Sequence, residues 1–156
     1  MKNKKVLYLV IAIVVVIGVA LFLMLKPRKM VCTSKSDQSK NGYVIENKYV
    51  ITARGKIVSK VEVTETITSD KKEKLESFNK QFEEQYSYFK KTYGGYEYKI
   101  NTKGNKLTTN VTINYKKIDM KKFIENNAAM KEYTKNDKFT ISGAKKMYEA
   151  SGATCK

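Results

Sequence analysis

The chain divides into stretches in which hydrophobic and polar residues follow different spacings. Residues 6–25 form one apolar run without a charge, flanked by Lys5 and Lys26. These twenty residues, at about 1.5 Å each, span a hydrocarbon core of about 30 Å, so the run predicts a transmembrane helix. The small residues Gly18 and Ala20 are followed by further apolar residues. We therefore expect an uncleaved anchor instead of a removable signal peptide.

The flanks of this run predict the orientation of the chain. Basic residues on its two sides almost balance, which weakens the positive-inside rule. Residues 1–5 are too few to hold a domain, so we expect a cytoplasmic head there and a single pass through a bacterial cytoplasmic membrane. Residues 26–42 contain several Ser and Lys and few apolar groups, which predicts a juxtamembrane tether. Residues 43–156 then form one extracytoplasmic domain.

Two segments of the predicted domain alternate with a period of two, which indicates β-hairpins. The first turns at Arg54-Gly55-Lys56, and its apolar positions are Tyr43, Ile45, Tyr49, Ile51, Ile57, Val61, Val63 and Ile67. The second turns at Gly104-Asn105, which suits a type II′ turn. Its apolar positions are Tyr96, Tyr98, Ile100, Leu107, Val111, Ile113 and Tyr115. The Thr, Asn and Lys side chains between them indicate a solvated sheet face, which is also one candidate for binding sugar or polymer.

Between the hairpins the apolar spacing changes to three and four residues, which predicts a helix of about six turns. Its apolar positions are Leu75, Phe78, Phe82, Tyr86, Phe89 and Tyr93. Asp70 and Glu73 predict a capping box at its start, and the pair Gly94-Gly95 predicts its end. We interpret the aromatic stripe as the core face of the helix; a ligand groove is the alternative.

The last forty residues predict two shorter helices and a short strand. Asp119 is a candidate cap for the first helix, and the continuation of that helix to Tyr133 stays open. Ser142 is a candidate cap for the second helix, which we expect to end at Gly152. Residues 139–141 predict the strand. The resulting fold class is α+β, an antiparallel sheet of two hairpins in the order ββ-α-ββ-α-(β)-α, packed on the long helix.

The two cysteines, Cys32 and Cys155, lie at opposite ends of the predicted domain. We expect a disulfide between them, because exported compartments are oxidising. Two free thiols, or bridges between chains, are the alternatives. The chain contains no histidine, so half of the usual zinc ligand set is missing, and we predict no metal site and no cofactor.

Basic residues outnumber acidic ones by 31 to 15, and the formal net charge is +16. Such a surface attracts teichoic acids, anionic lipid and nucleic acid. Arg28 and Arg54 are the arginines, and the remaining cations are lysines spread along the chain. Because specific phosphate sites favour arginine, we interpret the charge as compositional bias and expect no specific nucleic-acid partner. Electrostatic binding of polyanions stays as an alternative function.

Two segments are distinctive: Val-Thr-Ile-Asn-Tyr-Lys-Lys-Ile-Asp at the end of the second hairpin and Phe-Thr-Ile-Ser-Gly-Ala-Lys-Lys-Met-Tyr-Glu-Ala-Ser-Gly-Ala near the end of the chain. With these segments and the order of its elements, the chain resembles the small bacterial YehR-like lipoproteins over residues 43–156. The resemblance implies a compact α+β domain displayed outside the cytoplasmic membrane, in a family without an established activity. Cys32 follows Lys-Met-Val, which does not fit a lipidation site, so a peptide anchor replaces the lipid.

The sequence favours a function without catalysis. With no histidine, it lacks the usual general base and the Ser-His and Cys-His nucleophile systems. We interpret the acids of the long helix, and Glu62 and Glu65 in a strand, as solvated charges. A carboxylate pair acting as a cell-wall hydrolase is a further alternative. We expect an interaction module at the cell envelope that binds an envelope protein or an anionic cell-wall polymer.

Overall fold

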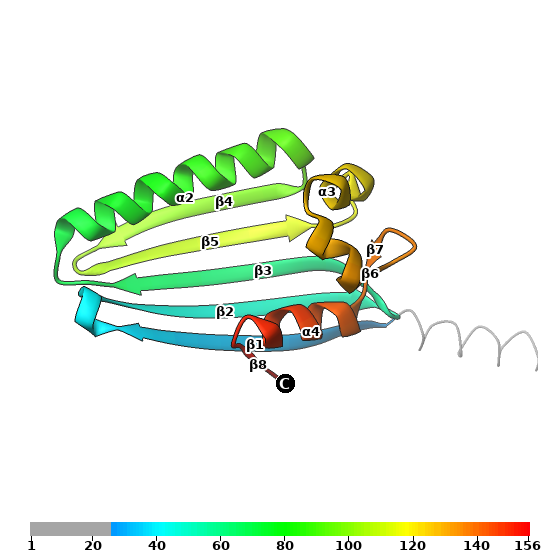
Figure 1. Ribbon diagram of the computed structural model, residues 1–156, viewed down its shortest axis with the longest axis horizontal. Helices are drawn as coiled ribbons and strands as arrows, with labels where there is room; N and C mark the ends of the chain where they lie inside the picture. The colour runs from blue at the N-terminus through cyan, green and yellow to red at the C-terminus, as the bar shows by residue number, and fades with distance from the viewer. Residues whose placement is uncertain (1–25) are drawn as a thin grey trace, which may run out of the picture.

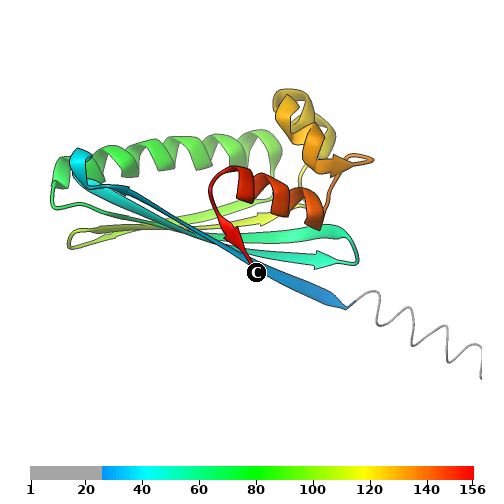
Figure 2. The ribbon, with the colours of Figure 1, turned by 60° about the horizontal axis from the view of Figure 1, so that its bottom comes forward.

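The computed structural model describes residues 26–156, which form an antiparallel sheet with helices on one side (Figures 1 and 2). Three long strands begin it: β1 (Pro27–Gln38), β2 (Tyr43–Arg54) and β3 (Ile57–Thr68). The 3-10 turn Ser39–Asn41 joins β1 to β2, and Gly55-Lys56 joins β2 to β3. The predicted turn of the first hairpin is therefore confirmed.

Helix α2 (Lys72–Tyr93) leads from β3 to the second hairpin, which consists of β4 (Tyr96–Lys103) and β5 (Lys106–Asn114). Gly94 ends the helix with φ +67°, and its N–H donates to the Lys90 carbonyl. β5 pairs with β3, so the sheet has the strand order β4-β5-β3-β2-β1-β8. Both predicted hairpins and the long helix are present, and the α+β class with an antiparallel sheet is confirmed.

The C-terminal part forms a second group of short elements above the sheet (Figure 2). These elements are α3 (Met120–Asn126), η2 (Ala128–Tyr133), β6 (Thr134–Lys135), β7 (Lys138–Phe139), α4 (Ile141–Ala150) and β8 (Thr154–Cys155). β8 returns to the sheet beside β1, where Cys32 and Cys155 are paired residues and form a disulfide. The predicted bridge is therefore present, and it closes the chain across 123 positions.

The core lies between the helices and the side of the sheet that faces them. Its fully buried side chains include Ile51, Val61, Ile67 and Leu107 from the strands and Phe139 from β7. Burying side chains of this size contributes about 1.5–3 kcal/mol each. The aromatic stripe of α2 packs into this layer as predicted: Phe78 contacts Tyr43 of β2 edge-on, with ring centroids 5.1 Å apart.

Residues 27–38 are a strand, so the predicted tether over residues 26–42 is wrong. β1 pairs with β2 in continuous register from Pro27 opposite Arg54 to Gln38 opposite Tyr43. Cys32 is its one buried residue, and most other positions are polar. A strand near the sheet margin needs few apolar groups, because backbone hydrogen bonds to β2 hold it in place.

Two predicted helix caps are also wrong. α2 begins after Lys71, without a side-chain cap; the Asp70 carboxylate instead accepts a hydrogen bond from the Asn105 side chain at 3.3 Å. α4 is capped by Thr140, whose Oγ1 accepts from the Gly143 N–H at 3.0 Å, and Ser142 lies inside the helix. The brief strand predicted over residues 139–141 ends at Phe139. Asp119 caps α3 as predicted, accepting from the Lys122 N–H.

The predicted cytoplasmic head and transmembrane segment lie outside the described residues. Within residues 26–156, no helix is long and apolar enough to cross a membrane.

Candidate functional site

One side of the sheet carries no helix in the part of the chain that the structure describes, and we name it the uncovered face (Figure 2). It contains the register row Thr33, Lys48, Thr64, Asn110 and Lys99. Every second residue on either side of that row also lies on this face, as far as the bulge between β2 and β3 at Thr52 and Ala53. Because strand residues alternate between the two sides, the polar positions of the sequence gather here. The uncovered face is therefore a broad surface of hydroxyl, amide and charged groups, interrupted by Val31, Val44 and Val50.

Charges of both signs alternate on the uncovered face. Lys35 on β1 and Glu46 on β2 form an ion pair of 2.9 Å, and Lys60 on β3 contacts Glu62 at the same distance. The hydrogen bond and charge of Lys35 lower the pKa of Glu46, so this carboxylate stays ionised at neutral pH. These pairs are exposed, and each contributes little to stability. They give the surface a mixed pattern of charge instead of a uniformly basic one.

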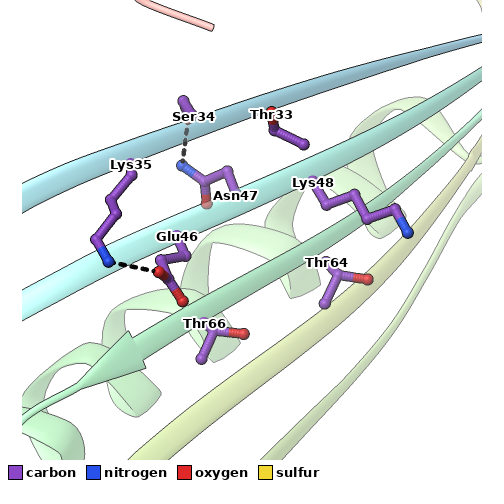
Figure 3. A pocket seen from close by; sticks show the side chains of 8 residues that line it. All are labelled: Thr33, Ser34, Lys35, Glu46, Asn47, Lys48, Thr64 and Thr66. Carbon is purple, nitrogen blue, oxygen red and sulfur yellow. Dashed lines mark hydrogen bonds and ion pairs between the residues drawn. The ribbon is translucent and has the colours of Figure 1, made fainter. Parts of the chain in front are cut away.

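A shallow hollow of about 360 Å³ lies on this surface across β1, β2 and β3 (Figure 3). The ion pair between Lys35 and Glu46 lies on one side of it, while the Lys48 ammonium points the opposite way. Thr64 and Thr66 supply hydroxyls from β3. The hollow thus offers donors and acceptors to a hydrated, polar group, and its one carboxylate is held by a lysine.

The helix-facing side of the sheet contains a second polar feature, the polar row, formed by Ser34, Asn47, Glu65 and Thr109 on four adjacent strands. The Asn47 amide donates to the Ser34 hydroxyl at 3.3 Å. Among the described residues, Asn47 Oδ1 and the fully buried Thr109 Oγ1 have no hydrogen-bond partner. Unpaired buried oxygens are costly, and ordered water is the ordinary partner at such positions.

Glu65 lies within the polar row, between Asn47 and Thr109 and on the side of the sheet that faces α2. Burial raises the pKa of its carboxyl group, and hydrogen bonding to Tyr86 of α2 opposes that rise. Burial, together with the nearby Glu65 charge, also raises the pKa of the Tyr86 hydroxyl. Tyr96 close by has its pKa raised to about 12, mainly by burial. Both hydroxyls therefore stay protonated at neutral pH, and that of Tyr86 donates to Glu65.

The interpretation of Glu65 as a solvated charge is wrong. Its strand reads Val61, Val63, Glu65 and Ile67 on the helix-facing side, so the alternation itself carried the signal that this carboxylate faces inward. Glu62, by contrast, points to the uncovered face and pairs with Lys60. The polar row contains one carboxylate; the neighbouring positions are Ser34, Asn47 and Thr109.

The two cysteines, predicted as a structural pair, lie together at the margin of the sheet. Next to the disulfide the backbone is also paired: the N–H groups of Val31 and Lys156 each donate to the other's carbonyl at 2.9 Å. Between Lys26 and Lys156, no group of three or more His, Cys, Asp or Glu side chains could hold a metal ion.

Comparison with solved structures identifies the fold. The E. coli YehR protein, known from an NMR structure, superposes with a TM-score of 0.53 and 20% sequence identity, over 83% of this chain and 91% of YehR. The domain has the YehR fold. A protein from Streptococcus pneumoniae TIGR4, also known from an NMR structure, superposes on this chain with a TM-score of 0.51 and 17% sequence identity, over 84% of this chain and 86% of that one. No family model and no curated protein matches the chain.

Proposed function

We propose that this protein is a single-pass membrane protein whose domain, residues 26–156, lies outside the cytoplasm in a bacterial cell envelope and acts there as a non-catalytic interaction module. The uncharged run of residues 6–25 supports the anchor. The disulfide between Cys32 and Cys155 supports an oxidising compartment, and with it an N-terminus in the cytoplasm.

The observation that carries the binding role is the uncovered face. Three strands of twelve residues, together with β4 and β5, present it as one broad surface that is polar except at Val31, Val44 and Val50. Its ion pairs mix carboxylates among the lysines. A surface that binds a uniform polyanion gains from unpaired cations, whereas a mixed pattern complements a protein surface with its own two signs of charge. We therefore place an envelope protein on the uncovered face and make an anionic cell-wall polymer the alternative.

Site-specific photocrosslinking in living cells tests this assignment. A photoreactive amino acid replaces Thr64, which lines the hollow on the uncovered face. The matched control replaces Glu84, an exposed residue of α2. We expect a discrete protein adduct from position 64 and none from position 84. Equal adducts from both positions, or none from either, contradict the placement of the partner.

Electrostatic binding of polyanions is the second candidate, favoured by the excess of basic residues. Its affinity for teichoic acid must fall steeply between 50 and 200 mM salt, because counterions are released on binding. A full-length protein that binds no polyanion at low salt excludes it. A zymogram on purified cell wall tests the hydrolase alternative: clearing by the wild type, lost in Glu65→Gln, would contradict a non-catalytic role.

A further inference from the structure

The end of the sheet where the described chain begins carries a cluster of unpaired cations, which we name the basic end. It consists of Lys26, Arg28, Lys29, Arg54, Lys56, Lys135 and Lys138, all exposed. Pro27 pairs with Arg54, so the start of β1 lies beside the end of β2. The turn between β2 and β3 follows at once, and the hairpin of β6 and β7 lies at the same end (Figures 1 and 2).

Direct contacts hold the two residues that follow the β6–β7 hairpin against the turn. The Ile141 N–H donates to the Lys56 carbonyl at 2.9 Å, and Ile57 forms a β-bridge with Thr140. Lys56, Lys135 and Lys138 line one open hollow of about 690 Å³. Asp137 in the hairpin turn is the acidic neighbour. Among the described residues, no member of the basic end forms an ion pair, whereas Lys146 nearby is neutralised by Glu132.

An exposed aliphatic side chain completes the basic end. Ile57 is 36% exposed and, with Tyr88, is one of the two large hydrophobic residues exposed in the described domain. It lies next to Lys56 in the chain and lines the same hollow. An apolar side chain set among lysines is typical of protein surfaces that touch the boundary between lipid headgroups and acyl chains.

The distance along the chain places the basic end at the membrane surface. The apolar run ends at Leu25 and β1 begins at Pro27, and two extended residues span at most about 7 Å. The headgroup layer is about 6 Å thick on each side of the hydrocarbon core, and the Debye length in physiological salt is about 8 Å. Because β1 starts without a tether, the paired residues Pro27 and Arg54 cannot move away from that layer independently of the sheet.

We infer that the basic end docks on the anionic headgroups of the bilayer that holds the anchor, which fixes the domain with its strands directed away from the membrane and its uncovered face accessible from the side. This inference rests on the membrane anchor of the proposed function. Each basic side chain near an anionic leaflet raises the docking equilibrium roughly fivefold. Neutralising three lysines therefore lowers it about a hundredfold.

The protein contains no tryptophan, so a single introduced tryptophan reports on one position. Full-length Ile57→Trp is reconstituted in vesicles of phosphatidylcholine, with or without phosphatidylglycerol, that contain brominated lipid as a contact quencher. The control is Lys40→Trp in the turn at the far end of β1, twelve residues from its start and thus roughly 40 Å away. We expect quenching at position 57 to be at least about twofold stronger on anionic than on neutral vesicles, and quenching at position 40 to be weak on both.

Charge variants test the contribution of the lysines. The first variant combines Lys56→Gln, Lys135→Gln and Lys138→Gln in the Ile57→Trp background. It should abolish the preference for anionic vesicles, or lower markedly the salt concentration at which that preference disappears. Lys99→Gln, Lys103→Gln and Lys106→Gln remove the same charge from the second hairpin, away from the basic end, and should leave the preference unchanged.

The outcomes separate the anchor from the docking. Protein that fails to float with vesicles after alkaline extraction overturns the anchor, and the docking with it. Protein that floats but shows equal quenching of position 57 on anionic and neutral vesicles overturns the docking alone. An equal loss from both triple variants also overturns it, because a general effect of net charge then explains the preference.

Discussion

The disulfide should contribute a large share of the stability of the domain. It closes a loop of 123 positions, and the chain-entropy relation assigns such a loop about 5 kcal/mol at 25 °C. Single domains are stable by only about 5–15 kcal/mol. Loss of the bridge should therefore bring the domain close to unfolding at growth temperature, provided that the bridge acts mainly on the unfolded chain.

Two single substitutions separate the crosslink from the packing of its sulfur atoms. Cys32 is fully buried, so Cys32→Ala removes the bridge and also leaves a cavity. Cys155 is partly exposed, so Cys155→Ala removes the bridge while Cys32 still fills its place. We expect a loss of about 3–5 kcal/mol for Cys155→Ala and about 1 kcal/mol more for Cys32→Ala.

Guanidinium titration of the full chain in detergent, followed by the near-ultraviolet circular dichroism of its buried tyrosines, measures these losses. Wild-type protein with reductant should behave like Cys155→Ala. If Cys155→Ala shifts the free energy of unfolding by less than about 1 kcal/mol, the loop does not constrain the unfolded chain as reasoned, and β8 merely detaches locally.

Three further substitutions test individual features. Burial raises the pKa of Glu65, so its charge costs stability only once the pH exceeds the pKa of about 4.3 that the group has in the unfolded chain. Glu65→Gln should therefore raise the melting temperature more at pH 7 than at pH 4. Glu62→Gln on the uncovered face should not show this difference between the two pH values. Thr140→Ala removes the N-cap of α4 and should lose about 1 kcal/mol in denaturant titration, whereas Ser142→Ala should be nearly neutral. Gly143→Ala would drive Cβ into the backbone carbonyl oxygen of Tyr133 in η2 and should cost roughly 3 kcal/mol, and a neutral result would contradict this packing.

The hairpins and α2 could be predicted because their signals are local. The alternation around Gly55 and Gly104 determines where each hairpin turns, and the spacing of the aromatic residues determines which side of α2 is buried. The ends of helices were harder to predict. Asp70 and Ser142 have the right residue type, but the neighbouring Asn105 and Thr140 decide the actual hydrogen bonds.

β1 could not be predicted because its stability comes from partners distant in sequence. The strand is mostly polar, so its side chains bury little apolar surface. Backbone hydrogen bonds to β2 and β8 hold it in the sheet instead. The polar row is a different case. Its pattern was visible in the alternation around Glu65, but a single carboxylate among valines looks like an ordinary surface charge until the register brings Asn47 and Thr109 beside it.

The position of the disulfide also determines how mechanical load passes through the molecule. Cys32 is the sixth residue of β1, and Cys155 is followed by a single residue. A pull between residue 26 and the C-terminus travels through residues 26–32 and the covalent bond, so the rest of the sheet carries no tension. A partner that pulls on the uncovered face instead loads the twelve paired positions of β1 and β2 in shear. The domain is thus mechanically protected at its C-terminus and mechanically responsive on its sheet.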